Sequence, residues 1–131
     1  MRVVFDTNIF VSALAFPGGQ ADKALLRIIE GRDQLLVSRP IIQELLDVLS
    51  TKFAQDREEL AHAAVFLSEL SQSVHPRKKL NVLHDDADNR ILECAQSGNA
   101  DVIVTGDRAM LRLREYGTIR ILTLREYLER D

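Results

Sequence analysis

The sequence predicts an α/β fold in which helices cover both faces of a parallel sheet. Short runs of β-branched and aliphatic residues, typical of buried strands, alternate along the chain with longer amphipathic stretches, typical of helices. The 131 residues suit a single domain spanning 1–131. No internal repeat or interdomain linker interrupts the alternation, which favours one continuous sheet.

The first predicted strand covers Val3–Phe5 and ends at Asp6. The strongest turn signal of the chain, Pro17–Gly19, comes next. We expect a helix after this turn, ending at Gly31. A second strand is expected at Leu35–Val37.

Two consecutive helices are expected after the second strand. Ser38 and Pro40 favour the start of the first one, because proline is tolerated in a first helical turn. Its apolar stripe consists of Ile42, Leu45, Leu46 and Leu49. Asp56 and Glu59 have the spacing of a capping box, which predicts that the second helix begins there.

The middle of the chain, Val74–Val82, is ambiguous and is expected to hold at most a short edge strand. The run His84–Asp88 then opens a helix that is expected to end near Gly98. Asp101–Thr105 is a strong strand prediction because it is rich in β-branched residues.

The last part of the chain repeats the alternation. Asp107 opens a helix that is expected to stop at Gly117. Ile119–Leu122 is the last predicted strand, and Thr123 caps a short final helix that reaches Leu128.

Bulk composition sets limits on the function. The net charge is −3, so no global positive field indicates non-specific nucleic-acid binding. One cysteine, Cys94, excludes an internal disulfide and a cysteine zinc cluster, and we expect it to be a small core residue. The first apolar run is too short for a signal peptide or a membrane span, so we expect a cytoplasmic protein with no membrane association.

Acidic residues fall where parallel sheets bind ligands, beyond the carboxyl ends of their strands. Asp6 directly follows the first strand, Asp107 follows the strand at Asp101–Thr105, and Asp88 opens a helix. Glu44 is in helical phase with the apolar residues of its own helix. An aspartate at a helix start is usually only a cap. The joint placement of four carboxylates at apolar positions instead predicts a site for a hard dication such as Mg²⁺.

Four short motifs carry a resemblance to a known family. They are Asp-Thr-Asn at 6–8, Ser-x-x-Ile-x-x-Glu-Leu at 38–45, Asp-Asn at 88–89 before Ile-Leu-x-x-Ala, and Val-Thr-Gly-Asp at 104–107. In this order and spacing the chain resembles the PIN-domain ribonucleases, and above all the PIN-type, VapC-like toxins of toxin–antitoxin systems. The resemblance runs from Val3 to about Leu128.

The resemblance implies a three-layer α/β/α sandwich with a central parallel sheet of four to five strands. It implies a Mg²⁺- or Mn²⁺-dependent endoribonuclease that hydrolyses phosphodiester bonds through metal-activated water. The implied catalytic residues are Asp6, Glu44, Asp88 and Asp107. Asp6, Asp88 and Asp107 are the expected metal ligands. The supporting residues of the pocket are Asn8, Thr105 and Asp85.

One departure from the family pattern concerns the acidic run. Related chains often carry an inner acid where Ala87 stands, so the role of Asp85 or Asp86 is left open. Arg108 and Arg112 are candidate RNA contacts beside the pocket, and the run Arg77–Lys79 is a weaker one. The resemblance also implies a cognate antitoxin partner and a homodimer.

Three other functions can be compared with this one, and the first two each lack a required residue. A phosphotransferase with an aspartyl nucleophile would need a second aspartate where Asn8 stands. A receiver domain would need a lysine after the last strand, where Thr123 stands. A catalytically weak PIN-fold module could bind nucleic acid or a protein, although the full set of four acids argues against it. His62, His75 and His84 lack the paired spacing of a metal site.

Overall fold

The computed structural model describes residues 1–52 and 56–130, with a six-stranded sheet in the order β3-β2-β1-β4-β6-β5 at its centre. The mutually parallel strands are β1 (Arg2–Phe5), β2 (Gln34–Ser38), β3 (Gln72–Val74), β4 (Val102–Val104) and β6 (Ile119–Leu122). β5 (Glu115–Tyr116) pairs antiparallel with β6 at one edge. The predicted parallel sheet is confirmed, and one antiparallel edge strand is added to it.

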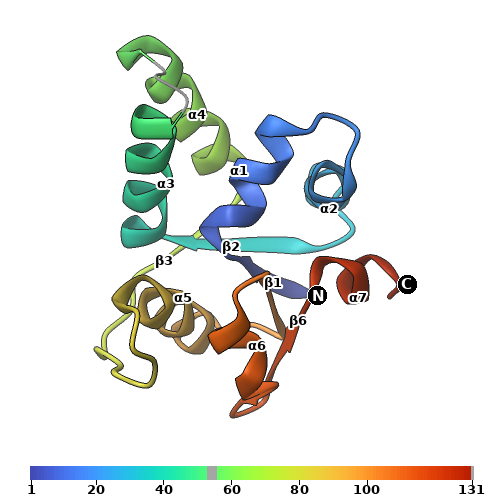
Figure 1. Cartoon of the computed structure of the whole chain (residues 1–131), viewed down its shortest axis with the longest axis vertical. Helices are drawn as coiled ribbons and strands as arrows, with labels where there is room; N and C mark the ends of the chain where they lie inside the picture. Colours follow the sequence, from blue (N-terminus) through green and yellow to red (C-terminus); the bar gives the residue numbers. More distant parts are fainter. Residues whose placement is uncertain (53–55, 131) are drawn as a thin grey trace.

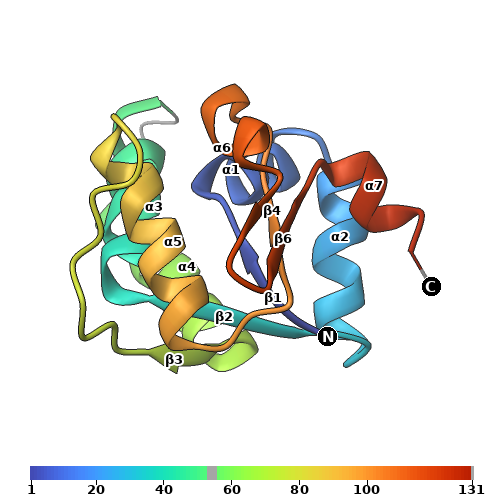
Figure 2. The same cartoon turned by 90° about the horizontal axis from the view of Figure 1, so that it is seen from below.

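Helices cover both faces of this sheet. They are α1 (Thr7–Ala15), α2 (Gln20–Ile29), α3 (Arg39–Lys52), α4 (Arg57–Leu70), α5 (Asp86–Ser97), α6 (Arg108–Leu113) and α7 (Leu124–Leu128). Figure 1 shows α1 and α2 on one side of the sheet and α5 and α6 on the other. Figure 2 shows α7 beside α2, with which it is in contact. The expected three-layer α/β/α arrangement is confirmed.

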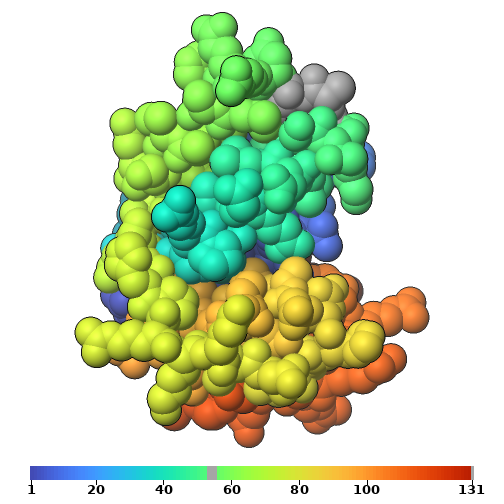
Figure 3. Space-filling view, turned by 90° about the vertical axis from the view of Figure 1, so that its left-hand side faces the viewer, coloured from blue at the N-terminus to red at the C-terminus, as the bar shows by residue number. Residues whose placement is uncertain are grey.

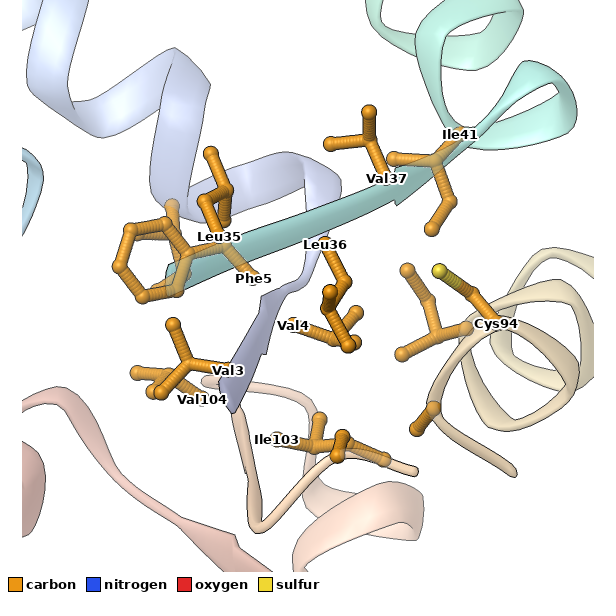
Figure 4. Packing of buried hydrophobic residues seen from close by; sticks show 14 of the residues in the cluster. Val3, Val4, Phe5, Leu35, Leu36, Val37, Ile41, Cys94, Ile103 and Val104 are labelled. Atoms are coloured by element: carbon orange, nitrogen blue, oxygen red, sulfur yellow. The ribbon is translucent and has the colours of Figure 1, made fainter. Parts of the chain in front are cut away.

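The alternation of side chains along β1 fills both halves of the core. Val4 and its partner Leu36 on β2 lie toward α5, where Cys94 is fully buried (Figure 4). Phe5 points to the opposite layer, and its ring lies 5.8 Å from those of Phe10 and Tyr127. Burial raises the pKa of the Cys94 thiol to about 12, which fits the expected role of a small core residue.

Helix α1 was not predicted. Its sequence, Thr-Asn-Ile-Phe-Val-Ser-Ala-Leu-Ala, mixes β-branched and apolar residues on several faces, so a helical period is hard to see. In the structure it buries Thr7, Ile9, Phe10 and Ala13. The predicted turn at Pro17–Gly19 follows it, with Gly18 at a positive φ of 81°. The first connection between strands therefore holds two helices.

Two boundaries also differ from the expectation. Helix α6 ends at Leu113 and not at Gly117, because Arg114 adopts a positive φ of 60° and the chain turns into β5. Gly117, with φ 61°, lies in the turn between β5 and β6. The short edge strand that was expected within 74–82 lies at Gln72–Val74.

Helix caps follow the sequence closely. Thr123 and Glu126 form a complete capping box at the start of α7. Asp56 accepts a hydrogen bond of 2.9 Å from the backbone N–H of Glu59 at the start of α4. No helix in the described part of the chain has the length and apolar character needed to cross a membrane.

The strand order reverses direction at the centre of the sheet. The chain moves from β1 to β2 on one side and later returns to β4 on the other side of β1. The register pairs Phe5 with Val104, so the carboxyl ends of β1 and β4 lie at the same level. Such a switch point is where open α/β sheets bind ligands, and here Asp6 and Thr105 extend beyond it.

Candidate active site

Hydrogen bonds join the carboxyl ends of β1 and β4. The backbone N–H of Asp6 donates to the carbonyl oxygen of Val104 at 3.0 Å. The hydroxyl of Thr105 donates to Asp6 Oδ2 at 2.7 Å and accepts from the backbone N–H of Asp107 at 3.0 Å. Thr105 is fully buried, so this link fixes one carboxylate oxygen of Asp6 and the start of the next loop.

Asp6 is a buried carboxylate, with 6% of its surface exposed. Burial raises its pKa, and the charge of Asp107 adds to that rise. The hydrogen bond from the Thr105 hydroxyl and the nearby backbone N–H groups of Asn8 and Thr7 oppose it. Hydrogen-bond donors thus hold the Asp6 carboxylate in place, although its burial makes the negative charge costly.

Glu44 projects from α3 toward the same sheet edge. Its Oε2 atom accepts a hydrogen bond of 3.1 Å from the hydroxyl of Thr7 at the start of α1. Burial raises the pKa of Glu44, the Thr7 bond lowers it, and the charges of Asp6 and Asp85 raise it. Sequence reasoning did not identify Thr7 as a site residue, because its partner lies 37 positions away along the chain.

Asp88 lies in the first turn of α5 and is 7% exposed. Its pKa is raised to about 7, first by burial and then by the charges of Asp107, Asp6 and Asp85. A side-chain hydrogen bond with Asp107 contributes in the same direction. These carboxyl groups are close enough to compete for ionisation, as expected for acids that share one site.

Asp107 has a structural role as well as a place in this cluster. Its Oδ2 atom accepts a hydrogen bond of 2.9 Å from the backbone N–H of Met110, which makes it the N-cap of α6. The cap interpretation considered for this residue is therefore correct. A role as helix cap is compatible with a role in the site, because Asp107 also raises the pKa values of Asp6 and Asp88.

Two residues predicted to support the site, Asp85 and Asn8, and the candidate RNA contacts are all exposed. Asp85 is exposed, caps α5 by accepting from the backbone N–H of Ala87 at 2.9 Å, and raises the pKa of Asp88 through its charge. The side chain of Asn8 is exposed, and its backbone N–H group lowers the pKa of Asp6. Arg108 and Arg112 are exposed on α6, which begins directly after Asp107.

The donor set can be tested against a metal ion. The four side chains offer only carboxylate oxygens, and burial, followed by repulsion from neighbouring carboxylates, raises the pKa values of Asp6, Glu44 and Asp88. A hard dication that prefers oxygen ligands would relieve that repulsion, so the chemistry fits Mg²⁺ or Mn²⁺. Within residues 1–52 and 56–130, no three acidic, histidine or cysteine side chains are already arranged to hold an ion.

Comparison with known proteins places this geometry in a family. The profile of the PIN domain matches residues 2–109. An uncharacterized protein of Methanocaldococcus jannaschii is 30% identical over 119 residues, which cover 88% of this chain and 76% of the relative.

Two solved structures share the fold. The structure of VapBC-1 from nontypeable Haemophilus influenzae superposes with a TM-score of 0.66 at 18% identity, over 95% of this chain and 99% of the other. VapBC2 from Rickettsia felis, solved bound to a DNA fragment from the promoter, gives a TM-score of 0.63 at 18% identity, over 94% of this chain and 98% of the other. The profile match covers most of the chain, and the chain belongs to the PIN domain family.

Proposed function

We propose that this protein is a divalent-metal-dependent endoribonuclease that hydrolyses RNA phosphodiester bonds. The observation that carries the proposal is the convergence of four carboxylates at the switch point of the sheet in a PIN domain. They are Asp6, Glu44, Asp88 and Asp107. In this proposal residues 1–131 form one catalytic domain.

Each side chain has a defined task in this reaction. A Mg²⁺ or Mn²⁺ ion held here would neutralise phosphate charge and supply activated water. Asp6 and Asp88 are the main ligands, and Asp107 completes the site. The Thr105 hydroxyl fixes Asp6 by its bond to Oδ2. Thr7 fixes Glu44 through Oε2, so that this carboxylate can orient the attacking water.

The negative charge of the cluster also bears on substrate binding. A phosphodiester would be repelled by four ionised carboxylates. Burial and the neighbouring charges raise the pKa of Asp88 to about 7, so we expect this carboxyl to be partly protonated near neutral pH. Ligation by a cation would favour loss of that proton, because the bound form of the carboxylate is ionised. Metal and substrate binding are therefore expected to be linked to pH.

We infer that the biological role is that of a toxin, expressed in the cytoplasm together with an antitoxin that blocks it. The motif resemblance to PIN-type toxins supports this role, and the two solved structures named above are VapBC assemblies. A homodimer is the expected assembly. A gene for a small protein next to this one, whose product binds the chain and stops cleavage, is the expected finding.

The activity is tested with purified protein and single-stranded RNA. Cleavage is expected with Mg²⁺ or Mn²⁺, and none with EDTA. Asp6→Asn should abolish cleavage and leave the circular dichroism spectrum unchanged, because the amide keeps the shape but loses the charge. Lys23→Gln, a substitution at an exposed position of α2, is the matched control and should cleave like the wild type.

A second candidate is a PIN-fold module that binds nucleic acid or a protein without hydrolysis. This candidate is considered because no three acidic, histidine or cysteine side chains in the described part of the chain are already arranged to hold an ion. Calorimetric titration with Mn²⁺ in the presence of RNA separates the two functions. RNA binding without ion binding or cleavage would support the module and contradict the nuclease.

A further inference from the structure

A cavity of about 530 Å³ lies between the start of α3, the loop after β3, and α5. Its walls carry Arg39, His75, Arg77, Lys78, Lys79 and Arg90. Its one acidic lining residue is Glu93, which is only 5% exposed. Five of the 17 lysine and arginine residues of a chain with net charge −3 therefore gather in one hollow. We call this hollow the basic groove.

The loop that supplies three of these cations is firmly attached to α5. Glu93 Oε2 accepts a hydrogen bond of 2.8 Å from the backbone N–H of Leu80. The fully buried side chain of Asn89 accepts from the N–H groups of Val82 and Leu83 at 3.0 and 2.9 Å, and donates to the carbonyl of Leu83 at 2.8 Å. Val74, at the other end of the loop, is paired in β3. The loop is anchored at both ends, so its cations are presented in a fixed region.

Most of these cations have no acidic partner in the described residues. Arg90 is the exception, with ion pairs to Glu93 at 3.3 Å and to Asp86 at 4.0 Å. Among residues 1–52 and 56–130, Arg39 and the run Arg77–Lys79 take part in no ion pair. Exposed cations that outnumber the carboxylates of their hollow attract an anionic chain.

The groove adjoins the acidic site along the sheet edge. The order β3-β2-β1-β4 places the residues that follow each strand in a row, namely His75, Arg39, Asp6 and Thr105. The edge therefore changes from a basic residue, Arg39, to an acidic one, Asp6, between the neighbouring strands β2 and β1. Helix α3 carries both Arg39 and Glu44, which five residues of helical rise separate by about 7.5 Å along the axis. Helix α5 likewise contributes Asp88 to the site and Arg90 to the groove.

Figure 3 looks onto this face of the molecule. The yellow-green segment that follows β3 lies beside the cyan start of α3 and the gold surface of α5. The same segment runs alongside α5 in Figure 2. The segments that line the basic groove therefore lie on an outer face of the molecule.

We propose that the basic groove binds the phosphate backbone of single-stranded RNA and leads the strand into the acidic site. The inference rests on the proposed nuclease function. It adds that the RNA strand crosses the surface formed by α3 and the loop between β3 and α5. Lysine and arginine on a fixed loop contact phosphates without reading bases, so the groove supplies affinity and not sequence choice. Arg108 and Arg112 would then contact the strand on the opposite side of the acids.

The test compares two triple variants, both combined with Asp6→Asn so that RNA stays intact. One carries Arg77→Gln, Lys78→Gln and Lys79→Gln in the groove. The control carries Lys23→Gln, Arg57→Gln and Arg125→Gln, which remove the same charge from exposed positions on α2, α4 and α7. Binding of a labelled single-stranded RNA and of the matching DNA is measured by fluorescence anisotropy over a range of salt concentrations.

The groove variant should bind RNA about tenfold or more weakly, and the slope of log affinity against log salt should become shallower by about 2 units. The control triple variant should keep the salt slope of the Asp6→Asn protein. Partial unfolding would lower the active fraction but would not change the slope, so the slope reports phosphate contacts. A groove variant with the same slope and affinity as the control would overturn the inference.

The failure of this inference is distinguishable from failure of the nuclease function. In the Asp6-containing protein the groove substitutions should raise KM for RNA and change kcat by less than about twofold, because they act on binding. Unchanged KM with normal metal-dependent cleavage would contradict the groove alone. Absence of both RNA binding and cleavage in the wild type would contradict the nuclease function and the groove together.

Discussion

The hydroxyl of Thr105 donates a 2.7 Å hydrogen bond to Asp6 across the ends of two neighbouring parallel strands. The two residues are 99 positions apart, and the pairing of β1 with β4 brings them together. The same hydroxyl accepts from the backbone N–H of Asp107. One small polar side chain therefore links two acids of the site, and its removal is a sharp test of how the site is built.

Thr105→Val should reduce RNA cleavage by about tenfold while the fold is kept, because valine has a similar shape but cannot donate. Loss of the bond should raise the pKa of Asp6 further, since that bond lowers it now. The acidic limb of the pH–rate profile should move to higher pH. Thr105→Ser restores a hydroxyl and should recover most of the activity. Equal profiles for the valine and serine variants would contradict this role.

Thr7→Val should lower kcat through Glu44, whose Oε2 atom loses its donor. The expected loss is about threefold to tenfold, smaller than at Thr105, because Glu44 is half-buried and solvent can replace the bond. Thr7→Ser should retain wild-type kcat. The measurement is single-turnover cleavage at saturating Mg²⁺, where an unchanged kcat in the valine variant would show that Thr7 only supports the fold.

Asp88→Asn should stabilise the metal-free protein at pH 7.5 and abolish cleavage. The pKa of Asp88 rises from its ordinary value of 3.8 to about 7 in the fold, so the folded state favours the protonated form. This contribution to stability is complete below about pH 3.8 and is lost as the pH rises through about 7. An asparagine, which is always neutral, escapes that loss.

Thermal denaturation in EDTA checks the Asp88 prediction. The melting temperature of Asp88→Asn should exceed that of the wild type at pH 7.5, and the difference should shrink as the pH falls to 5. Saturating Mg²⁺ should stabilise the wild type and not the variant. A difference that is independent of pH would contradict the assigned titration.

The acids themselves could be predicted because their positions follow from local rules. Asp6 ends an apolar strand, and Asp88 and Asp107 begin helices, so the sheet topology alone brings them to one edge. The layers and four of the five parallel strands could be predicted from apolar patterns in the same way, whereas β3 was expected only as a possible edge strand within 74–82 and lies at Gln72–Val74. Helix α1 could not, because its apolar residues point to the sheet and to neighbouring helices and leave little periodic contrast.

The interactions between distant segments were beyond sequence reasoning. The pair Thr7–Glu44 spans 37 residues, and nothing in either local pattern points to the other. The basic run Arg77–Lys79 was noted as a weak candidate, but its meeting with Arg39 and Arg90 depends on how the loop is attached to α5. That attachment uses two buried polar residues in the middle of a helix, whose partners only the fold reveals.

Asn89→Ala should destabilise the protein by about 2–3 kcal/mol, because it removes three hydrogen bonds from a fully buried amide and leaves loop groups unpaired. Gln96→Ala, an exposed change on the same helix, should cost less than about 0.5 kcal/mol. Urea denaturation measures both. A similar cost for the two substitutions would show that the loop is not held by Asn89.

Calorimetric titration of Mn²⁺ into the wild type and into Asp6→Asn tests the central claim, that the carboxylate cluster is a metal site, most directly. At pH 6.5 the wild type should bind the ion and release a fraction of a proton, because Asp88 with a pKa of about 7 is partly protonated there. The release is read from the dependence of the binding heat on the buffer. Asp6→Asn should show no binding in the same range. Absence of binding in the wild type, or equal binding in both proteins, would contradict the assignment.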